Sequence, residues 1–517
     1  MDIATCLRPF PRIDGNCQTG AGGIGRRWGS RVCPGLAALA LVSALLPLPG
    51  RALAQGLPAD IEAALARAKL PRDAVAVLVV DAQGKEAPRV SHRVDVAMNP
   101  ASVMKLVTTS AALDLLGPAY TWTTSVFVDG PVREGRLEGN LYIKGQGDPT
   151  LVSERFWQLM RRVRSLGINR INGDIVLDRS AFSLAPTDPG GFDGEPLRPY
   201  NAAPDALLLS YKSVLMTFVV DRTANLARIH VDPPLAGVKI PDTVPLAAGG
   251  CGDYRASLRA DFSDPGQIRF AGSYPATCQE RTWPLAWPDP QVYAARAVEG
   301  MWREVGGQLA GSVRDGLVPP AAGPAVFEVT SPALAEVIRD INKYSNNVMA
   351  QQVFLSLSLP AGRDANGKPV VNDVQAQGPA SLAASRDVLQ QWWRARIGAT
   401  VEAPLVDNGS GLSRYSRTSA MALGRLLQTA YQSPWMPELM SSLPIAGIDG
   451  TMRRNRSGAV GSAHLKTGSL RDVTAVAGYV LASSGRRYVV VLMANHANAG
   501  ASRAVIDKLL EWVIREN

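Results

Sequence analysis

The chain has 517 residues, of which 46% are hydrophobic and 19% are charged, and its formal net charge is +9. This composition is typical of a folded protein with more than one domain, and it excludes disordered and collagen-like chains. The basic residues are scattered and form no run with interleaved aromatic side chains, so we expect no nucleic-acid partner.

Residues 1–54 are predicted to be a secretory signal peptide. Arg26 and Arg27 precede an apolar stretch over residues 36–46, and Ala52-Leu53-Ala54 offers a cleavage point before Gln55. The stretch is short for a membrane span, and an uncleaved anchor is the alternative. We therefore expect a protein that is exported across the inner membrane to the periplasm or cell envelope.

The cysteines agree with export. Cys6, Cys17 and Cys33 fall in the predicted leader, so the mature chain keeps only Cys251 and Cys278. In an oxidising compartment this pair predicts one disulfide, and two buried free thiols are the alternative. Neither cysteine has a C-x-x-C spacing, and the four histidines lack a metal-ligand spacing, so we expect no metal and no cofactor.

The front of the mature chain predicts a helix over residues 60–68 and a strand over residues 74–81. Asn99-Pro100 then opens a helix that runs to about Leu116, because proline suits the first helical turn. Ser102 should lie in that first turn. Gly117-Pro118 ends the helix.

The sequence pattern changes over residues 118–320. Short alternating segments, punctuated by Gly, Pro and Asp, predict a β-rich region with strands over 125–128, 141–144, 174–177 and 227–231. A helix over 292–305 and a strand over 312–315 close the region, and the proline-rich residues 319–324 indicate a linker.

The rest of the chain predicts helices over 332–356, with a break near Ser345, then over 380–397 and 419–431. Strands over 464–467, 475–482 and 488–494 and a helix over 502–514 follow. Strands and helices at both ends indicate that the two ends build one sheet. We therefore expect one domain from residues 55–117 and 321–517, interrupted by an insert of residues 118–320 with two nested parts.

Three short motifs carry chemistry: Ser102-Val103-Met104-Lys105, Ser345-Asn346-Asn347 and Lys466-Thr467-Gly468. They are S-x-x-K, S-x-N and K-T-G. Alone, S-x-x-K occurs by chance about once or twice in a chain of this length and reads equally well as an exposed helix. The case rests on all three in order, each in the expected element, because a serine needs a neighbouring base to become a nucleophile.

With these motifs the chain resembles the class C, low-molecular-mass penicillin-binding proteins, the D-alanyl-D-alanine carboxypeptidase/endopeptidase family. Gly145–Leu151 and Asp407–Arg414 add to the resemblance, as does the gap of 243 residues between Ser102 and Ser345. The resemblance implies an α+β fold: a serine β-lactamase-like transpeptidase domain with an antiparallel sheet flanked by helices and split by the insert.

It also implies roles. Ser102 is the expected nucleophile, Lys105 its base, Ser345 a proton relay, and Asn347 a holder of the substrate backbone. The expected substrate-binding residues are Lys466, Thr467, Gly468, Ser469 and Arg414. The expected substrates are peptidoglycan peptides, and β-lactams are the expected covalent inhibitors. The oligomeric state stays open.

In this family an acidic side chain of the insert often reads the third residue of the stem peptide. Here the corresponding place holds Ser210, and Asp205 is the substitute, although a cap or turn role suits Asp205 better. Two competing functions remain: a serine β-lactamase, against which the long insert argues, and a non-catalytic scaffold, which would not need complete motifs.

Overall fold

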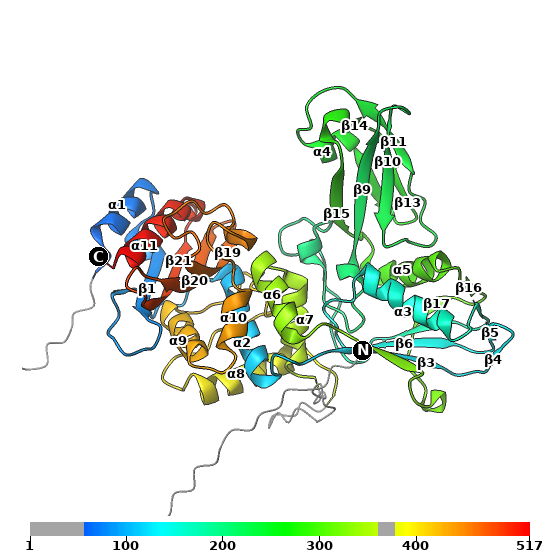
Figure 1. Cartoon of the computed structure of the whole chain (residues 1–517), viewed down its shortest axis with the longest axis horizontal. Coiled ribbons are helices and arrows are strands. Elements are labelled where there is room, and N and C mark those ends of the chain that lie inside the picture. The colour runs from blue at the N-terminus through cyan, green and yellow to red at the C-terminus, as the bar shows by residue number, and fades with distance from the viewer. Residues whose placement is uncertain (1–55, 360–377, 517) are drawn as a thin grey trace, which may run out of the picture. The chain divides into compact units, whose positions relative to one another are not determined.

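The two ends of the chain share one sheet in the computed structural model, which describes residues 56–359 and 378–516 (Figure 1). The sheet is antiparallel and has the order β19-β20-β21-β1-β2. Its strands are β1 (Val75–Asp81), β2 (Val90–His92), β19 (Ala463–Leu470), β20 (Val473–Leu481) and β21 (Arg487–Asn495). The pairing of β1 with β21 confirms that the chain termini build one sheet. The predicted signal peptide lies outside the described residues.

Both faces of this sheet are covered, which explains why β1 reads as a continuous apolar run. Val75, Val77 and Val79 pack on one face with α1 (Ala59–Arg67) and α11 (Arg503–Arg515). Ala76 and Leu78 point to the other face, where most of the helices lie. These helices are α2 (Lys105–Leu115), α6 (Leu334–Tyr344), α7 (Asn347–Ser356), α8 (Leu382–Arg396), α9 (Ala420–Tyr431) and α10 (Met436–Ser442).

The insert begins after α2 and forms its own core. One sheet has the order β17-β8-β6-β3-β18, and a smaller one has the order β16-β7-β5-β4. The strands are β3 (Thr123–Val128), β4 (Val132–Arg133), β5 (Arg136–Leu137), β6 (Leu141–Gly145), β7 (Arg170–Ile171), β8 (Ile175–Asp178), β16 (Gln308–Leu309), β17 (Val313–Asp315) and β18 (Phe327–Thr330). Helices α3 (Ser153–Ser165) and α5 (Pro290–Glu304) cover it.

A second part is nested inside the first, because the chain leaves after β8 and returns with α5. Its sheet has the order β14-β11-β10-β9-β15, with a separate β12-β13 hairpin (Figure 1). The elements are β9 (Ser213–Asp221), β10 (Leu226–Asp232), β11 (Thr243–Ala247), α4 (Tyr254–Leu258), β12 (Ala260–Asp264), β13 (Gln267–Phe270), β14 (Tyr274–Pro275) and β15 (Arg281–Ala286). The mixed α and β architecture agrees with the expected fold class.

Two features of the insert differ from the expectations. Helix α3 was not expected, although Phe156, Leu159, Met160 and Val163 are buried at helical spacing. Strand β18 pairs with β3, so the sheet of the insert continues beyond residue 320, where we expected the insert to end.

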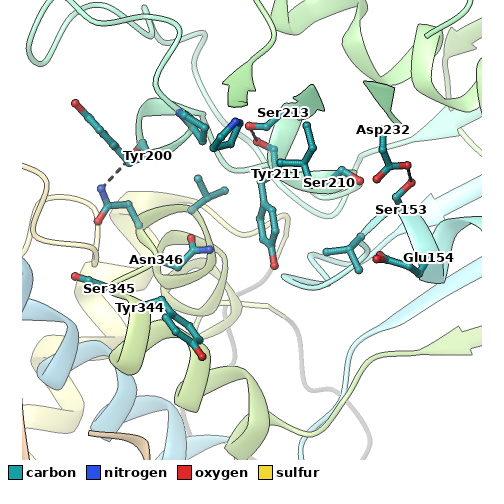
Figure 2. A pocket seen from close by; sticks show the side chains of 16 residues that line it. Ser153, Glu154, Tyr200, Ser210, Tyr211, Ser213, Asp232, Tyr344, Ser345 and Asn346 are labelled. Atoms are coloured by element: carbon teal, nitrogen blue, oxygen red, sulfur yellow. Dashed lines mark hydrogen bonds between the residues drawn. The ribbon is translucent and has the colours of Figure 1, made fainter. Parts of the chain in front are cut away.

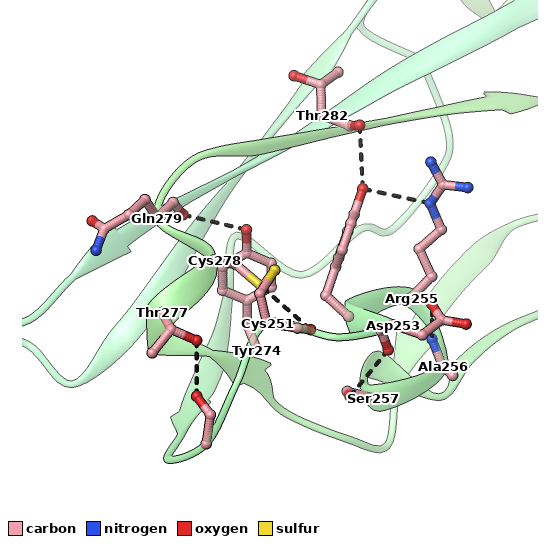
Figure 3. Close-up of a disulfide and its surroundings, with 12 residues drawn as sticks. Cys251, Asp253, Arg255, Ala256, Ser257, Tyr274, Thr277, Cys278, Gln279 and Thr282 are labelled. Atoms are coloured by element: carbon pink, nitrogen blue, oxygen red, sulfur yellow. Dashed lines mark hydrogen bonds between the residues drawn. A yellow bond between two sulfur atoms is a disulfide. The ribbon is translucent and has the colours of Figure 1, made fainter.

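A disulfide joins Cys251 and Cys278, whose Cα atoms lie 4.7 Å apart (Figure 3). This confirms the predicted pairing. Beside it, the Thr277 hydroxyl donates a hydrogen bond of 2.8 Å to the Gly249 carbonyl, so the same two chain segments meet twice. The bridge therefore fastens the loop after β11 to the turn after β14, inside the nested part.

We expect replacement of both cysteines by serine to lower the free energy of unfolding of the insert by about 3 kcal/mol, because the bridge closes a loop of 27 residues. Urea unfolding, followed by circular dichroism, measures the change. Reduction of the wild type should give the same shift and leave the double serine variant unchanged. An effect of reduction on the double variant would show that something other than this bridge is responsible.

Candidate active site

Two of the three motifs and the loop at Ser410 meet around one buried amine. The Lys105 side chain is fully buried, and its Nζ lies 2.9 Å from Ser102 Oγ, 2.6 Å from Asn347 Oδ1 and 2.6 Å from the Ser410 carbonyl oxygen. These partners come from three distant parts of the chain. A buried amine without such partners would cost several kcal/mol, so their convergence defines the centre of the site.

The turn that carries Ser102 is strained. Residues Ala101–Met104 form a 3₁₀ turn that leads into α2 at Lys105, so the helix starts more tightly than the sequence predicted. Ala101, directly before Ser102, has φ +47°, a left-handed conformation that a non-glycine residue rarely adopts. Such strain costs about 1–3 kcal/mol and persists only where the surroundings enforce it.

Asn99 and Asn495 enforce this conformation. The Asn99 Oδ1 accepts a hydrogen bond of 2.8 Å from the Ala101 N–H, and its Nδ2 donates to the Ser413 carbonyl at 2.9 Å. The Asn495 side chain bonds both the N–H and the carbonyl of Asn99, at 2.8 and 3.0 Å. The strand β21 therefore holds the turn of Ser102 through one asparagine pair. Sequence reasoning missed both residues.

The second lysine of the site connects two motifs. Lys466 on β19 is fully buried, and its Nζ donates to Ser345 Oγ at 2.9 Å and to the Thr467 carbonyl at 2.7 Å. Ser345 follows the end of α6 with φ +59°, and this left-handed residue produces the predicted break between α6 and α7. The Ser345 hydroxyl is thereby turned toward β19.

The two asparagines of the S-x-N motif have different partners. Asn347 reaches Lys105 with its Oδ1, while its Nδ2 donates to the Tyr200 carbonyl of the insert at 3.3 Å. Asn346 instead caps α7, because its Oδ1 accepts from the Met349 N–H at 3.1 Å. The structure thus places Asn347 in the site and Asn346 outside it.

Two glycines let three segments approach. A Cβ on Gly468 would lie 2.5 Å from the Pro100 carbonyl oxygen and 2.9 Å from the Ser102 nitrogen, so β19 runs against the turn of Ser102. A Cβ on Gly411, which has φ +77°, would lie 2.0 Å from the Ala101 carbonyl oxygen. Only glycine fits these two positions. Ser469 follows Gly468 on β19 and is exposed.

Arg414 has partners at the edge of the site. Its guanidinium lies 4.9 Å from the centre of the Phe192 ring and 3.6 Å from the Asp472 carboxylate. Phe192 belongs to the insert, and Asp472 to the turn after β19. Together with the Tyr200 carbonyl, this contact shows that residues 192–200 of the insert border the site, which sequence reasoning did not predict.

Asp205, the acidic residue considered for substrate recognition, makes contacts within the insert. Asp205 is buried and pairs with Lys212 at 2.9 Å and with Arg179 at 3.4 Å, and it accepts a hydrogen bond from the Leu207 N–H. This agrees with the turn role. Ser210 lines a cavity beside the S-x-N loop.

This cavity, of about 570 Å³, lies between the insert and the start of α7 (Figure 2). Ser210, Tyr211 and Asp232 line it from the insert, and Tyr344 and Asn346 line it from the helical side. The Ser345 hydroxyl points away from the cavity, toward Lys466. Ser345 and Asn347 also line the cavity, so it adjoins the loop that carries the motif.

Burial sets the electrostatics of the site. Desolvation lowers the pKa of Lys466 to about 7. The pKa of Lys105 lies well below its ordinary value, first because of burial and second because of the nearby Lys466 charge. A lysine with a lowered pKa is available as a base near neutral pH.

The family model described as the D-Ala-D-Ala carboxypeptidase 3 (S13) family matches residues 57–515. The chain belongs to this family. A D-alanyl-D-alanine carboxypeptidase of Actinomadura sp. strain R39 is 28% identical over 520 residues, which cover 95% of this chain and 91% of that protein. D-alanyl-D-alanine carboxypeptidase DacB of Haemophilus influenzae is 25% identical over 416 residues, covering 78% and 81%.

The fold of this chain is also similar to that of a solved structure. The crystal structure of penicillin binding protein 4 from Haemophilus influenzae matches with a TM-score of 0.69 and 22% identity, covering 88% of this chain and 98% of that one. Together with the family match, this likeness confirms the resemblance on which the fold was predicted. Within the described residues no helix is both long and apolar enough to cross a membrane.

We expect Asn99→Ala and Asn495→Ala each to lower the free energy of unfolding by about 2 kcal/mol, because each leaves buried polar atoms of the Ser102 turn without partners. Urea unfolding measures both. The double variant should lose less than the sum of the two, since either change alone releases the same turn. Strict additivity would show that the two asparagines support different parts of the structure.

Proposed function

We propose that the chain is a secreted serine-type D-alanyl-D-alanine carboxypeptidase, with endopeptidase activity, that cuts peptidoglycan stem peptides and cross-links through an acyl-enzyme on Ser102. One observation carries this proposal: Lys105 Nζ lies 2.9 Å from Ser102 Oγ and bonds two acceptors besides. The S13 family membership supports the same activity.

The partners of Lys105 suit a neutral amine. A neutral amine has two N–H donors and one lone pair, and Asn347 Oδ1 and the Ser410 carbonyl can only accept. In the ammonium form the third N–H donates to Ser102 Oγ at 2.9 Å. Once that proton is lost, the other two N–H groups still serve Asn347 and Ser410, and the lone pair faces the Ser102 hydroxyl. The lowered pKa of Lys105 favours this form. Lys105 is therefore the proposed general base.

In the acylation step the Ser102 oxygen attacks the carbonyl carbon between the two D-alanines, and its proton passes to Lys105. The C–N bond then breaks, and Ser345 relays the proton from Lys105 to the leaving nitrogen, so D-alanine departs as an amine and Lys105 becomes neutral again. Water later attacks the ester carbon and restores the Ser102 hydroxyl. We propose that the Ser102 and Ser469 N–H groups hold the oxyanion, where one such donor contributes about 3 kcal/mol.

The terminal carboxylate of the substrate is assigned to Lys466 and Thr467, and Gly468 leaves room for the peptide along β19. The Asn347 amide is assigned to the peptide backbone of the substrate. To bind it, Asn347 Nδ2 gives up its 3.3 Å hydrogen bond to the Tyr200 carbonyl. Arg414 borders the same region with the insert. An endopeptidase cut uses the same chemistry, since the leaving nitrogen then belongs to the side chain of a second stem peptide. Export to the periplasm, from the leader sequence, brings the enzyme to its substrate.

The proposal is tested by intact mass after incubation with benzylpenicillin, for the mature protein and for Ser102→Ala. A stable adduct is expected on the wild type and none on the variant, because alanine removes the attacking oxygen. In a second arm the wild type should release D-alanine from a peptide that ends in D-Ala-D-Ala, and split cross-linked muropeptide dimers.

Other outcomes favour the competing functions. Rapid loss of penicillin without a lasting adduct would indicate a β-lactamase. Intact penicillin with no adduct would indicate a scaffold. Release of D-alanine without splitting of the dimers would remove the endopeptidase part and keep the rest.

The two lysines predict a bell-shaped pH profile of kcat/KM for D-alanine release. Lys105 must be neutral, so activity rises as the pH increases through its lowered pKa. Lys466 must be charged to hold the carboxylate, so activity falls as the pH increases through about 7 in the free enzyme. Bound carboxylate stabilises the Lys466 cation, so the alkaline limb of kcat should lie at higher pH.

Lys466→Arg is the matched variant, because arginine stays charged throughout this range. Its remaining activity should lack the alkaline limb. A wild-type profile in which the alkaline limbs of kcat and kcat/KM coincide would contradict the role given to Lys466.

A further inference from the structure

A hydroxyl outside the three motifs lies against the K-T-G motif. Thr467 Oγ1 donates a hydrogen bond of 2.7 Å to Oγ1 of Thr451, which is exposed. Thr467 comes from β19, whereas Thr451 belongs to a 3₁₀ turn, Gly450–Met452 (η7), some 16 residues earlier. The tertiary fold therefore creates a hydroxyl pair where the proposed function places the terminal carboxylate of the substrate.

The position of Thr451 is fixed by an ion pair between the buried Lys343 and the partly exposed Asp449. Lys343, whose side chain is 4% exposed, contacts Asp449 Oδ2 at 2.6 Å and the Leu443 carbonyl at 2.7 Å. Asp449 Oδ1 accepts from the Ile445 N–H at 2.8 Å. Burial opposes ionisation of Asp449, but these hydrogen bonds outweigh it and lower its pKa. The turn that begins at Asp449 is thus anchored to the end of α6.

Gly450 brings the turn still closer to that helix. Its φ is +54°, and a Cβ there would lie 2.6 Å from the Lys343 carbonyl oxygen. Ser345 follows Lys343 by two residues. The end of α6 therefore sets the positions of both the Ser345 hydroxyl and the Thr451 hydroxyl, one on each side of Lys466 and Thr467 in the hydrogen-bond network.

The chain after Thr451 is basic. Arg453, Arg454 and Arg456 are exposed, and none makes an ion pair with a residue of the two described ranges, 56–359 and 378–516. Exposed cations without acidic partners create a positive potential, which attracts an anionic group to this side of the site.

We propose that Thr451 is a specificity residue for the terminal carboxylate of the substrate, working with Thr467 as a hydroxyl pair; the inference rests on the proposed function. In the free enzyme Thr467 donates to Thr451. When a carboxylate arrives, the two hydroxyls rotate: Thr451 donates to Thr467, and Thr467 donates to the carboxylate. A hydroxyl that accepts one hydrogen bond donates a stronger one, so Thr451 strengthens the hydrogen bond from Thr467 to the carboxylate.

The test compares two substrates, an N-acylated peptide that ends in D-Ala-D-Ala and the same peptide with a terminal carboxamide. Thr451→Val removes the hydroxyl and keeps the shape. We expect it to lower kcat/KM for the carboxylate peptide about tenfold, mainly through KM, because a hydrogen bond to a charged group is weakened. The value for the carboxamide should change little, and Thr451→Ser should restore the wild-type value.

The matched control is Thr282→Val, which breaks an exposed hydroxyl pair with Thr217 at 3.1 Å in the insert and should leave both values unchanged. Equal losses on both substrates, or wild-type kinetics for Thr451→Val, would overturn the inference. A wild type that releases no D-alanine from either peptide would instead refute the proposed function, so the two failures are distinct.

Discussion

The burial of Lys105 is the constraint on which the site depends. An amine at zero exposure must satisfy its hydrogen bonds inside the protein, and its three partners come from the turn of Ser102, the start of α7 and the loop at Ser410. If one of these segments shifts, the amine loses a partner. The same contacts that stabilise the fold therefore hold the proposed nucleophile, the proposed base and the S-x-N motif in register.

The insert takes part in this arrangement and is not merely attached to it. Its residues 192–200 supply the Tyr200 carbonyl to Asn347 and the Phe192 ring to Arg414. Asp205 adds a further contact, because its N–H donates a hydrogen bond of 2.9 Å to Gln352 Oε1 of α7. Helix α7 thus contacts both the insert and Lys105, so the insert packs against an element that positions the proposed base.

The residue types of the three motifs were enough to predict the centre of the site, because their chemistry depends on side chains at short or ordered spacing. Asn495 was not predictable, since it contacts Asn99, which is 396 residues away in sequence. Thr451 was not predictable either, because its contact with Thr467 depends on how a 3₁₀ turn packs against β19. Ser410 contributes a backbone oxygen, which no side chain reveals. Helix α3 had a readable apolar period, but the surrounding short strands favoured a β interpretation.

Among the described residues of this domain three lysines are buried, and their partners separate their roles. Lys343 is paired with the Asp449 carboxylate and anchors the turn that follows it, which is a structural role. Lys105 and Lys466 bond only hydroxyl, amide and carbonyl groups within the described residues. A carboxylate beside either one would raise its pKa and hold its proton. Because neutral partners leave the proton exchangeable, Lys105 is available for the proposed role as a base, and Lys466 for the proposed pairing with the carboxylate of the substrate.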